Sequence, residues 1–180
     1  MDVSFAWHIT WTCFGTWLPG DERGHVSNII HREGGWEPKR NTPGSPAAAG
    51  DTSIRERARA LQKGETVWLT AAQAACAARA MVDAARERGW RILRASLMAN
   101  HIHAVVCDCP NDGPAVRRAL KGVSQAALSS ASGKPQRWWT AGGSDRAKAD
   151  PIAIENTVTY VANQENKLVE IIDNEVHILQ

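Results

Sequence analysis

The chain has 180 residues, enough for one domain with a sizeable buried core, and its 43% hydrophobic and 22% charged residues are ordinary for a globular protein. No apolar run approaches the roughly 20 residues of a membrane span, and the first residues lack the basic and apolar regions of a secretory signal, so we expect a cytoplasmic protein with no membrane partner. A net charge of +2 is compatible with a polyanionic partner without indicating one, and four cysteines do not suggest a disulfide framework.

The first predicted element is a strand over residues 3–13, where apolar and polar side chains alternate. The next stretch, about residues 19–65, is rich in Gly, Pro, Asn and charged residues, and only Ile54 to Leu61 favours a short helix. We therefore predict one domain over residues 1–180 with a long loop insertion at about 19–65.

The rest of the chain alternates helices and strands. Thr70 is a suitable N-cap for a helix that Gly89 would end, and Asp112 with Pro114 begins another. The elements expected after the insertion are a helix over 70–88, strands over 90–98 and 101–107, a helix from 112, a strand over 137–140, a helix over 150–167 and a short strand within 169–180.

This order, β-α-β-β-α-β with an appended helix, predicts an α+β protein of the ferredoxin-like, split βαβ class. The expected sheet is antiparallel, carries two helices on one face and leaves the other face free for a ligand.

Two histidines stand out on the third predicted strand. His101 and His103 are two residues apart, so both imidazoles project from one face while Ile102 points into the core. Two neighbouring imidazoles form half of a divalent metal site with open positions. Alone, such a pair is more often two surface histidines on an exposed sheet than a metal site, so it needs a chemical partner.

The last predicted helix supplies a candidate partner. Tyr160 lies on its polar face, with Gln164 one turn further on. A phenol can act as a covalent nucleophile when a metal polarises the phosphate that it attacks, and the Gln164 amide could complete the metal's ligands. From the helix alone, a surface tyrosine that packs its ring on a neighbour is the better explanation. The apolar stripe that defines the opposite face is Ile154, Val158, Val161 and Leu168.

Five segments resemble the HUH endonuclease superfamily and, within it, the single-tyrosine transposases of the insertion-sequence and REP-associated types. They span residues 3–18 and 68–167 in the family's order. The segments are the His-hydrophobic-His strand 98–106, the tyrosine helix 160–164, the basic segment 120–124, the Trp-to-Gly segment 138–144 and the first strand 7–11.

The resemblance implies a transposase that cleaves and rejoins single-stranded DNA bearing hairpins or palindromic repeats. It implies Tyr160 as catalytic residue, forming a 5′-phosphotyrosine, and a divalent metal, Mg²⁺ or Mn²⁺, held by His101, His103 and Gln164. Asn163 is an alternative metal ligand, because REP-associated members use an asparagine near this position. Members are commonly homodimers, and whether Tyr160 serves its own or its partner's metal site stays open.

Basic residues between the two halves of this site are candidates for DNA binding, through phosphate contacts that weaken with salt. Solvated side chains with no ligand would give the same pattern. We expect Trp138 and Trp139 to pack in the protein rather than stack on bases, and His8 to line the DNA face or be structural. The candidate DNA-binding residues are Arg117, Arg118, Lys121, Arg137, Arg146 and Lys148.

Three other functions compete with an active transposase. A domesticated, REP-associated nuclease would process chromosomal palindromes with the same residues. A DNA-binding module of the same fold would have lost catalysis. A zinc hydrolase would use His101 and His103 with Cys107 or Cys109, although no glutamate lies near as a general base.

Overall fold

The computed structural model describes residues 3–23, 29–30, 36–37, 49–110 and 112–179. The chain divides into two units, one made of Met1–Cys13 with Val67–Gln180 and the other of Phe14–Thr66. The predicted insertion at about 19–65 falls in the second unit, and its residues 24–28, 31–35 and 38–48 lie outside the described residues.

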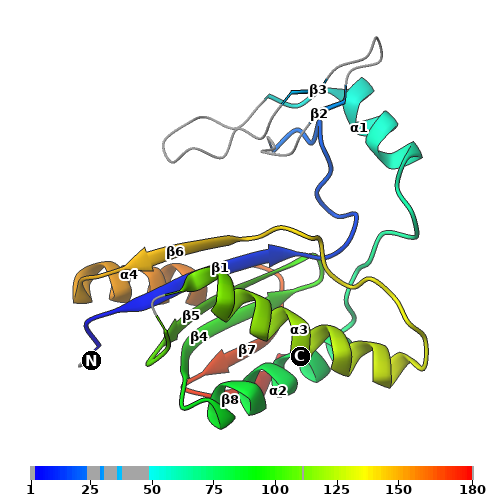
Figure 1. The fold of residues 1–180 in the computed structure, drawn as a ribbon. Coiled ribbons are helices and arrows are strands. Elements are labelled where there is room, and N and C mark those ends of the chain that lie inside the picture. Colours follow the sequence, from blue (N-terminus) through cyan, green and yellow to red (C-terminus); the bar gives the residue numbers. More distant parts are fainter. Residues whose placement is uncertain (1–2, 24–28, 31–35, 38–48, 111, 180) are drawn as a thin grey trace. The chain divides into compact units, whose positions relative to one another are not determined.

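The first unit is built on a six-stranded antiparallel sheet with the strand order β6-β1-β5-β4-β7-β8 (Figure 1). Strand β1 lies between β5 and β6, so each βαβ half of the sheet is split by a strand of the other half. The predicted ferredoxin-like, split βαβ class is therefore confirmed. The strands of this sheet are β1 Ala6–Thr12, β4 Arg91–Met98, β5 His101–Cys107, β6 Ser144–Lys148, β7 Lys167–Ile172 and β8 Glu175–Ile178.

Two long helices, α2 (Ala71–Glu87) and α3 (Gly113–Ser132), cover one face of the sheet (Figure 1). The predicted caps are present: Thr70 forms a capping box at the start of α2, and Asp112 accepts a hydrogen bond from the backbone N–H of Ala115 at the start of α3. The side of α2 that faces inward is mostly alanine, which lets the helix approach its neighbours closely.

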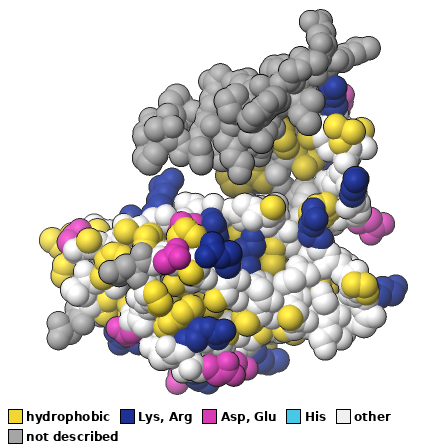
Figure 2. Space-filling model, in the orientation of Figure 1, with side chains coloured by type: hydrophobic (Ala, Val, Ile, Leu, Met, Phe, Trp, Pro, Cys, Tyr) yellow, Lys and Arg dark blue, Asp and Glu magenta, His cyan; other side chains and the backbone are white. Residues whose placement is uncertain are grey.

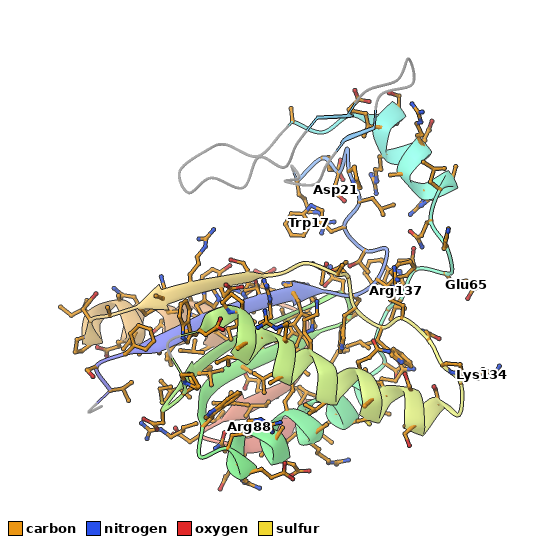
Figure 3. All side chains as sticks on the ribbon, in the orientation of Figure 1. Trp17, Asp21, Glu65, Arg88, Lys134 and Arg137 are labelled. Atoms are coloured by element: carbon orange, nitrogen blue, oxygen red, sulfur yellow. The ribbon has the colours of Figure 1, made fainter. Side chains whose placement is uncertain are left out.

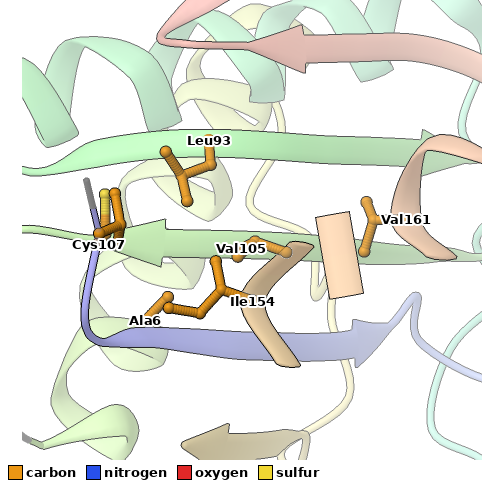
Figure 4. Close-up of a cluster of buried hydrophobic side chains, with 7 residues drawn as sticks. Ala6, Leu93, Val105, Cys107, Ile154 and Val161 are labelled. Atoms are coloured by element: carbon orange, nitrogen blue, oxygen red, sulfur yellow. The ribbon is translucent and has the colours of Figure 1, made fainter. Parts of the chain in front are cut away.

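The fourth helix, α4 (Pro151–Ala162), lies on the opposite face, whereas the sequence predicts that this face is free. Its Ile154 and Val161 pack in one apolar cluster with Leu93, Val105 and Cys107 of the sheet (Figure 4). Burial of these side chains fixes which side of α4 faces the sheet. Part of the face that carries the histidines is thus covered by the helix that carries Tyr160.

Three predicted elements differ from the structure. The fourth strand of the sheet is Ser144–Lys148, not residues 137–140, where Trp139 forms only an isolated bridge with Cys13. The final helix ends at Ala162 rather than at about Lys167, because Asn166 has a positive φ of 54°, which an α-helix does not contain, and Lys167 already begins β7. The Nζ of Lys167 donates to the carbonyl of Ala162. The tail forms a hairpin, β7–β8, in place of a single strand.

The second unit contains the short hairpin β2 (Ile29–Ile30) with β3 (Trp36–Glu37) and the helix α1 (Thr52–Ala60), close to the predicted helix 54–61. Asp21 accepts from Nε and Nη2 of Arg23 at 2.7 and 2.8 Å, and the guanidinium lies 4.9 Å from the centre of the Trp17 ring. Figure 3 labels Trp17 and Asp21, the two residues that Arg23 contacts. This ion pair holds the pKa of Asp21 at about 2, well below its usual value.

The surface formed by the long helices carries charge of both signs. In Figure 2, Lys and Arg side chains on this face stand beside Asp and Glu side chains, with apolar ones between them. No helix among the described residues is both long and apolar enough to cross a bilayer.

Candidate active site

His101 and His103 project from one face of β5, a strand flanked on both sides by others. Ile102 between them is fully buried under the helices of the opposite face, as predicted. The centres of the two imidazole rings are 5.0 Å apart, with ring planes at 81° to each other. Both rings are half-buried, so they are held in place and still face solvent.

Each of these imidazoles has its Nδ1 atom engaged by a neighbouring side chain. His101 Nδ1 donates to Oδ1 of Asn100 at 2.7 Å, and His103 Nδ1 lies 3.1 Å from Nε2 of His8 on β1. A proton on Nδ1 places the lone pair of a neutral imidazole on Nε2, the nitrogen through which such a ring can bind a metal. Contacts of this kind orient the histidine ligands of metal sites.

Burial keeps two of the histidines uncharged near neutral pH. It lowers the pKa of His103 to about 3, helped by the neighbouring His101 and His8. It likewise lowers the pKa of His8 to about 4, helped by the positive charges of Lys148 and Arg146. Only neutral imidazole can donate its lone pair to a metal, so these shifts suit a metal ligand and its hydrogen-bonded partner.

Tyr160 lies directly against these histidines. Its ring meets His103 and His8 edge to face, with centres 5.6 and 5.9 Å apart, and 52% of the residue is exposed. Its hydroxyl makes no hydrogen bond with a described residue. The phenol therefore belongs to the same cluster as the histidines, and its oxygen is accessible from solvent.

Two contacts hold the tyrosine helix in place. Ser96, which pairs with His103 across β4 and β5, is fully buried and donates from Oγ to the carbonyl of Val161 at 2.6 Å. Asp150 caps the other end of α4 by accepting from the N–H of Ala153 at 2.8 Å. Ser96 thus ties the residue after Tyr160 to the strand beside the histidines.

Gln164 lies just beyond the end of α4 and not within it. Its Nε2 donates to the carbonyl of Tyr160 at 3.1 Å, which keeps the side chain beside the tyrosine and leaves Oε1 as an acceptor. Asn163 is the C-cap of the helix and is exposed. Either amide as a metal ligand stays a prediction.

Two of the six candidate DNA-binding residues share the histidine face. Arg146 pairs with His8 and Lys148 pairs with Ala6 across β1 and β6, so their side chains point to the side of the sheet that carries His8. They place positive charge beside the cluster, and they are the same charges that help to lower the pKa of His8.

The other four candidates have different surroundings. Arg117 forms an ion pair with Asp145 at 2.6 Å. Lys121 donates from Nζ to the carbonyls of Thr140 and Gly142. Burial of this amine, together with the nearby charge of Arg117, lowers the pKa of Lys121 to about 8. The remaining two are exposed: Arg118 lies 3.9 Å from Asp112, and Arg137 is in the loop before Trp138 (Figure 3). Trp138 and Trp139 are both buried, so the prediction that they pack in the protein is confirmed.

The donors present, two imidazoles and a side-chain amide, fit the ligand set of a divalent cation. Among the residues that the structure describes, no three His, Cys, Asp or Glu side chains converge as a metal site, and the candidate third donor is the side-chain amide of Gln164 or Asn163. The proposed zinc cluster lacks support: Cys107 is four residues beyond His103 on the strand, roughly 13 Å away, and packs in the apolar cluster under α4.

His8 is a residue of the cluster whose contacts the sequence did not reveal. Its alternation with Thr10 places it on one side of β1, but only the pairing of β1 with β5 brings it to His103. In the sequence, residues 7–11 resemble the first strand of the transposase family, but this resemblance assigns no role to His8.

No protein-family model matches the chain, and no curated protein sequence matches it. Among solved structures, it is similar to a REP-associated tyrosine transposase bound to a REP hairpin, with 12% identity, a TM-score of 0.43, and 88% of this chain and 65% of that one covered. It is also similar to a candidate transposase from Deinococcus radiodurans R1, with 14% identity, a TM-score of 0.41, and 88% of this chain and 89% of that one covered. The chain thus spans slightly under two thirds of the first of these proteins.

Proposed function

We propose that the protein is a metal-dependent transesterase that cleaves and rejoins single-stranded DNA, as a tyrosine transposase does, with Tyr160 as nucleophile. The observation that carries this proposal is the position of the exposed Tyr160 ring, 5.6 Å from the ring of His103 in the same chain. The ring lies against the uncharged imidazoles of His8 and His103, on the face of the sheet that also carries Arg146 and Lys148. The five sequence segments that resemble single-tyrosine transposases point to the same chemistry.

The reaction is a balanced exchange of one phosphodiester for another. Oη of Tyr160 attacks the scissile phosphorus, the new P–O bond to tyrosine forms, and the P–O3′ bond breaks. The phenol proton is transferred through solvent and ends on the departing 3′-hydroxyl. A free 3′-hydroxyl then attacks the 5′-phosphotyrosine and restores both the phosphodiester and the phenol, so no nucleotide cofactor is consumed.

His101 and His103 are the proposed ligands of Mg²⁺ or Mn²⁺ through Nε2, with Gln164 Oε1 as third ligand and Asn163 as its alternative. A bound divalent cation would polarise the scissile phosphate and stabilise the charge that develops on it. Asn100 orients His101 through the hydrogen bond at Nδ1. The tyrosine hydroxyl is presented by α4, whose position Ser96 fixes.

We further propose that Tyr160 acts in cis, because its ring contacts the histidines of its own chain. Arg146 and Lys148 are the proposed phosphate contacts, since they share the histidine face. A hairpin or palindromic substrate and a homodimer are further parts of this proposal, and both rest on the sequence resemblance. A domesticated, REP-type nuclease would use the same site and the same reaction.

A covalent-adduct assay tests the proposal. The protein is mixed with end-labelled hairpin-bearing single-stranded DNA from the sequence that flanks its gene, with Mg²⁺ or Mn²⁺, and separated under denaturing conditions. We expect a labelled adduct that requires the metal, persists in the surface control Thr159→Ala and is lost in Tyr160→Phe. An adduct that survives in Tyr160→Phe contradicts the assignment, and DNA binding with no adduct favours a non-catalytic module.

A further inference from the structure

His8 touches both parts of the proposed active site. Its Nε2 is 3.1 Å from Nδ1 of His103, and the two rings are stacked, with centres 5.4 Å apart and planes at 22°. On its other side, it meets the ring of Tyr160 edge to face at 5.9 Å. Among the described residues, these contacts make His8 a side chain that meets the proposed metal ligand and the proposed nucleophile at once.

The sheet fixes this position. His8 pairs with Val105 and His103 pairs with Thr10, so the two histidines are diagonal neighbours on the same face of β1 and β5. Strand β1 is itself held between β5 and β6. His8 therefore approaches His103 on a rigid part of the fold, where a hydrogen bond can define the orientation of a ring.

The direction of that hydrogen bond follows from what a metal requires. His103 can bind through Nε2 only if that nitrogen has no proton, and then a neutral ring carries its proton on Nδ1. That Nδ1–H must find an acceptor, and the adjacent atom is Nε2 of His8. An acceptor at this place selects the tautomer and the rotation of His103 that direct Nε2 outward.

We propose that His8 is a positioning residue, which accepts a hydrogen bond from Nδ1–H of His103, thereby presents Nε2 of His103 to the metal, and supports the ring of Tyr160. This inference rests on the proposed function, because it needs His103 as a metal ligand. It adds a residue on the first strand to a site that the sequence assigns to the third strand and the last helix.

The first test is the affinity of the whole protein for Mn²⁺ in four variants, each checked for folding by circular dichroism. Loss of a histidine's supporting partner typically weakens metal binding by about 10–100-fold, and we expect this for His8→Ala. His8→Gln, which can place a carbonyl oxygen near the position of Nε2, should recover most of the affinity. Thr10→Val, on the same face of β1, is the matched control and should bind as the unmodified protein does; His103→Ala should lose binding.

The outcomes separate this inference from the proposed function. If His103→Ala loses Mn²⁺ and His8→Ala binds normally, the metal site stands and His8 is only a packing residue. If His8→Gln is as weak as His8→Ala, the hydrogen bond is not the cause and the inference is wrong. If His103→Ala binds Mn²⁺ normally, the proposed metal site is wrong and the inference falls with it.

A second test needs no substitution. Nitrogen-15 NMR of the histidine rings in the metal-free protein reports which nitrogen of each ring is protonated. We expect the Nδ1–H form for His103, with its Nε2 unprotonated. Free histidine favours the opposite tautomer, so an Nε2–H form of His103 would overturn the inference even if every variant folded poorly.

Discussion

The hydroxyl of Ser96 offers a sharp test of how the tyrosine helix is held. Ser96→Ala removes a fully buried donor that lies 2.6 Å from the carbonyl of Val161, the residue after Tyr160. The N–H of Gln164 reaches the same carbonyl only at 3.4 Å, so the substitution leaves that acceptor poorly satisfied. A buried polar group that loses its partner costs about 1–3 kcal/mol, which we expect as the loss in the free energy of unfolding.

Denaturant unfolding measures this loss, and in a protein of this size each kcal/mol corresponds to a fall in Tm of about 2–4 °C. Ser124→Ala is the matched control, because Ser124 is equally buried but donates to carbonyls of Leu120 and Lys121, which the helix ladder of α3 already satisfies. We expect its unfolding free energy to change by less than about 1 kcal/mol. Equal effects of the two substitutions would refute the reasoning.

The same variant connects stability with chemistry. If Ser96 fixes the position of α4, Ser96→Ala should form the covalent DNA adduct more slowly than Ser124→Ala at a temperature where both variants remain folded. An adduct rate equal to that of the unmodified protein, together with the expected loss of stability, would show that Ser96 stabilises the fold without positioning Tyr160.

Two further predictions concern the charges around the site. In the metal-free protein, the pKa values of His8 and His103 are lowered to about 4 and about 3, so below pH 6.5 the unfolded chain binds more protons than the folded one. The free energy of unfolding should therefore fall as the pH drops from about 6.5 towards 4, by up to about 1.4 kcal/mol per pH unit for each histidine. Denaturant unfolding curves that do not change over this pH range would contradict the lowered pKa values. Arg146→Ala and Lys148→Ala should each weaken binding of single-stranded DNA and reduce the slope of log affinity against log salt by about 0.7. Arg117→Ala should instead lower the melting temperature with little change in that slope, because Arg117 is paired with Asp145; the reverse pattern would move the DNA path to the other face of the sheet.

The elements with strong local signals were predictable from the sequence. Thr70 and Asp112 mark the starts of α2 and α3, and β5 was placed to the residue, because capping and alternation are properties of neighbouring residues. Those signals were sufficient to derive the ferredoxin-like order. They also placed His101 and His103 on one face with Ile102 on the other.

The misplaced strand shows where local signals fail. Ser144–Lys148 is an edge strand of mostly polar residues, so no apolar alternation marks it in the sequence. The neighbouring apolar residues Trp138 and Trp139 favour a strand at 137–140 in the sequence, but in the structure they are buried without belonging to a strand. The end of α4 was also missed, because neither Gly nor Pro follows Ala162 to mark it in the sequence.

The candidate site was predictable in its residue types and not in its contacts. The approach of His8 to His103 depends on the register between β1 and β5, which are about 90 residues apart in sequence. The separation of the basic residues has the same origin: Arg146 and Lys148 flank the histidines, and Lys121 is engaged by the backbone of the loop after Trp139. Pairing across the sheet, and not sequence spacing, decides which charges meet the site.

The central claim is that Tyr160 forms a covalent bond with DNA, and mass spectrometry of the adduct tests it most directly. After nuclease trimming and trypsin digestion, the claim predicts a nucleotide joined through its 5′-phosphate to the peptide of residues 149–167, which contains the only tyrosine of the chain. A nucleotide found on any other residue, or its complete absence from metal-activated protein that binds the DNA, would contradict the proposed mechanism.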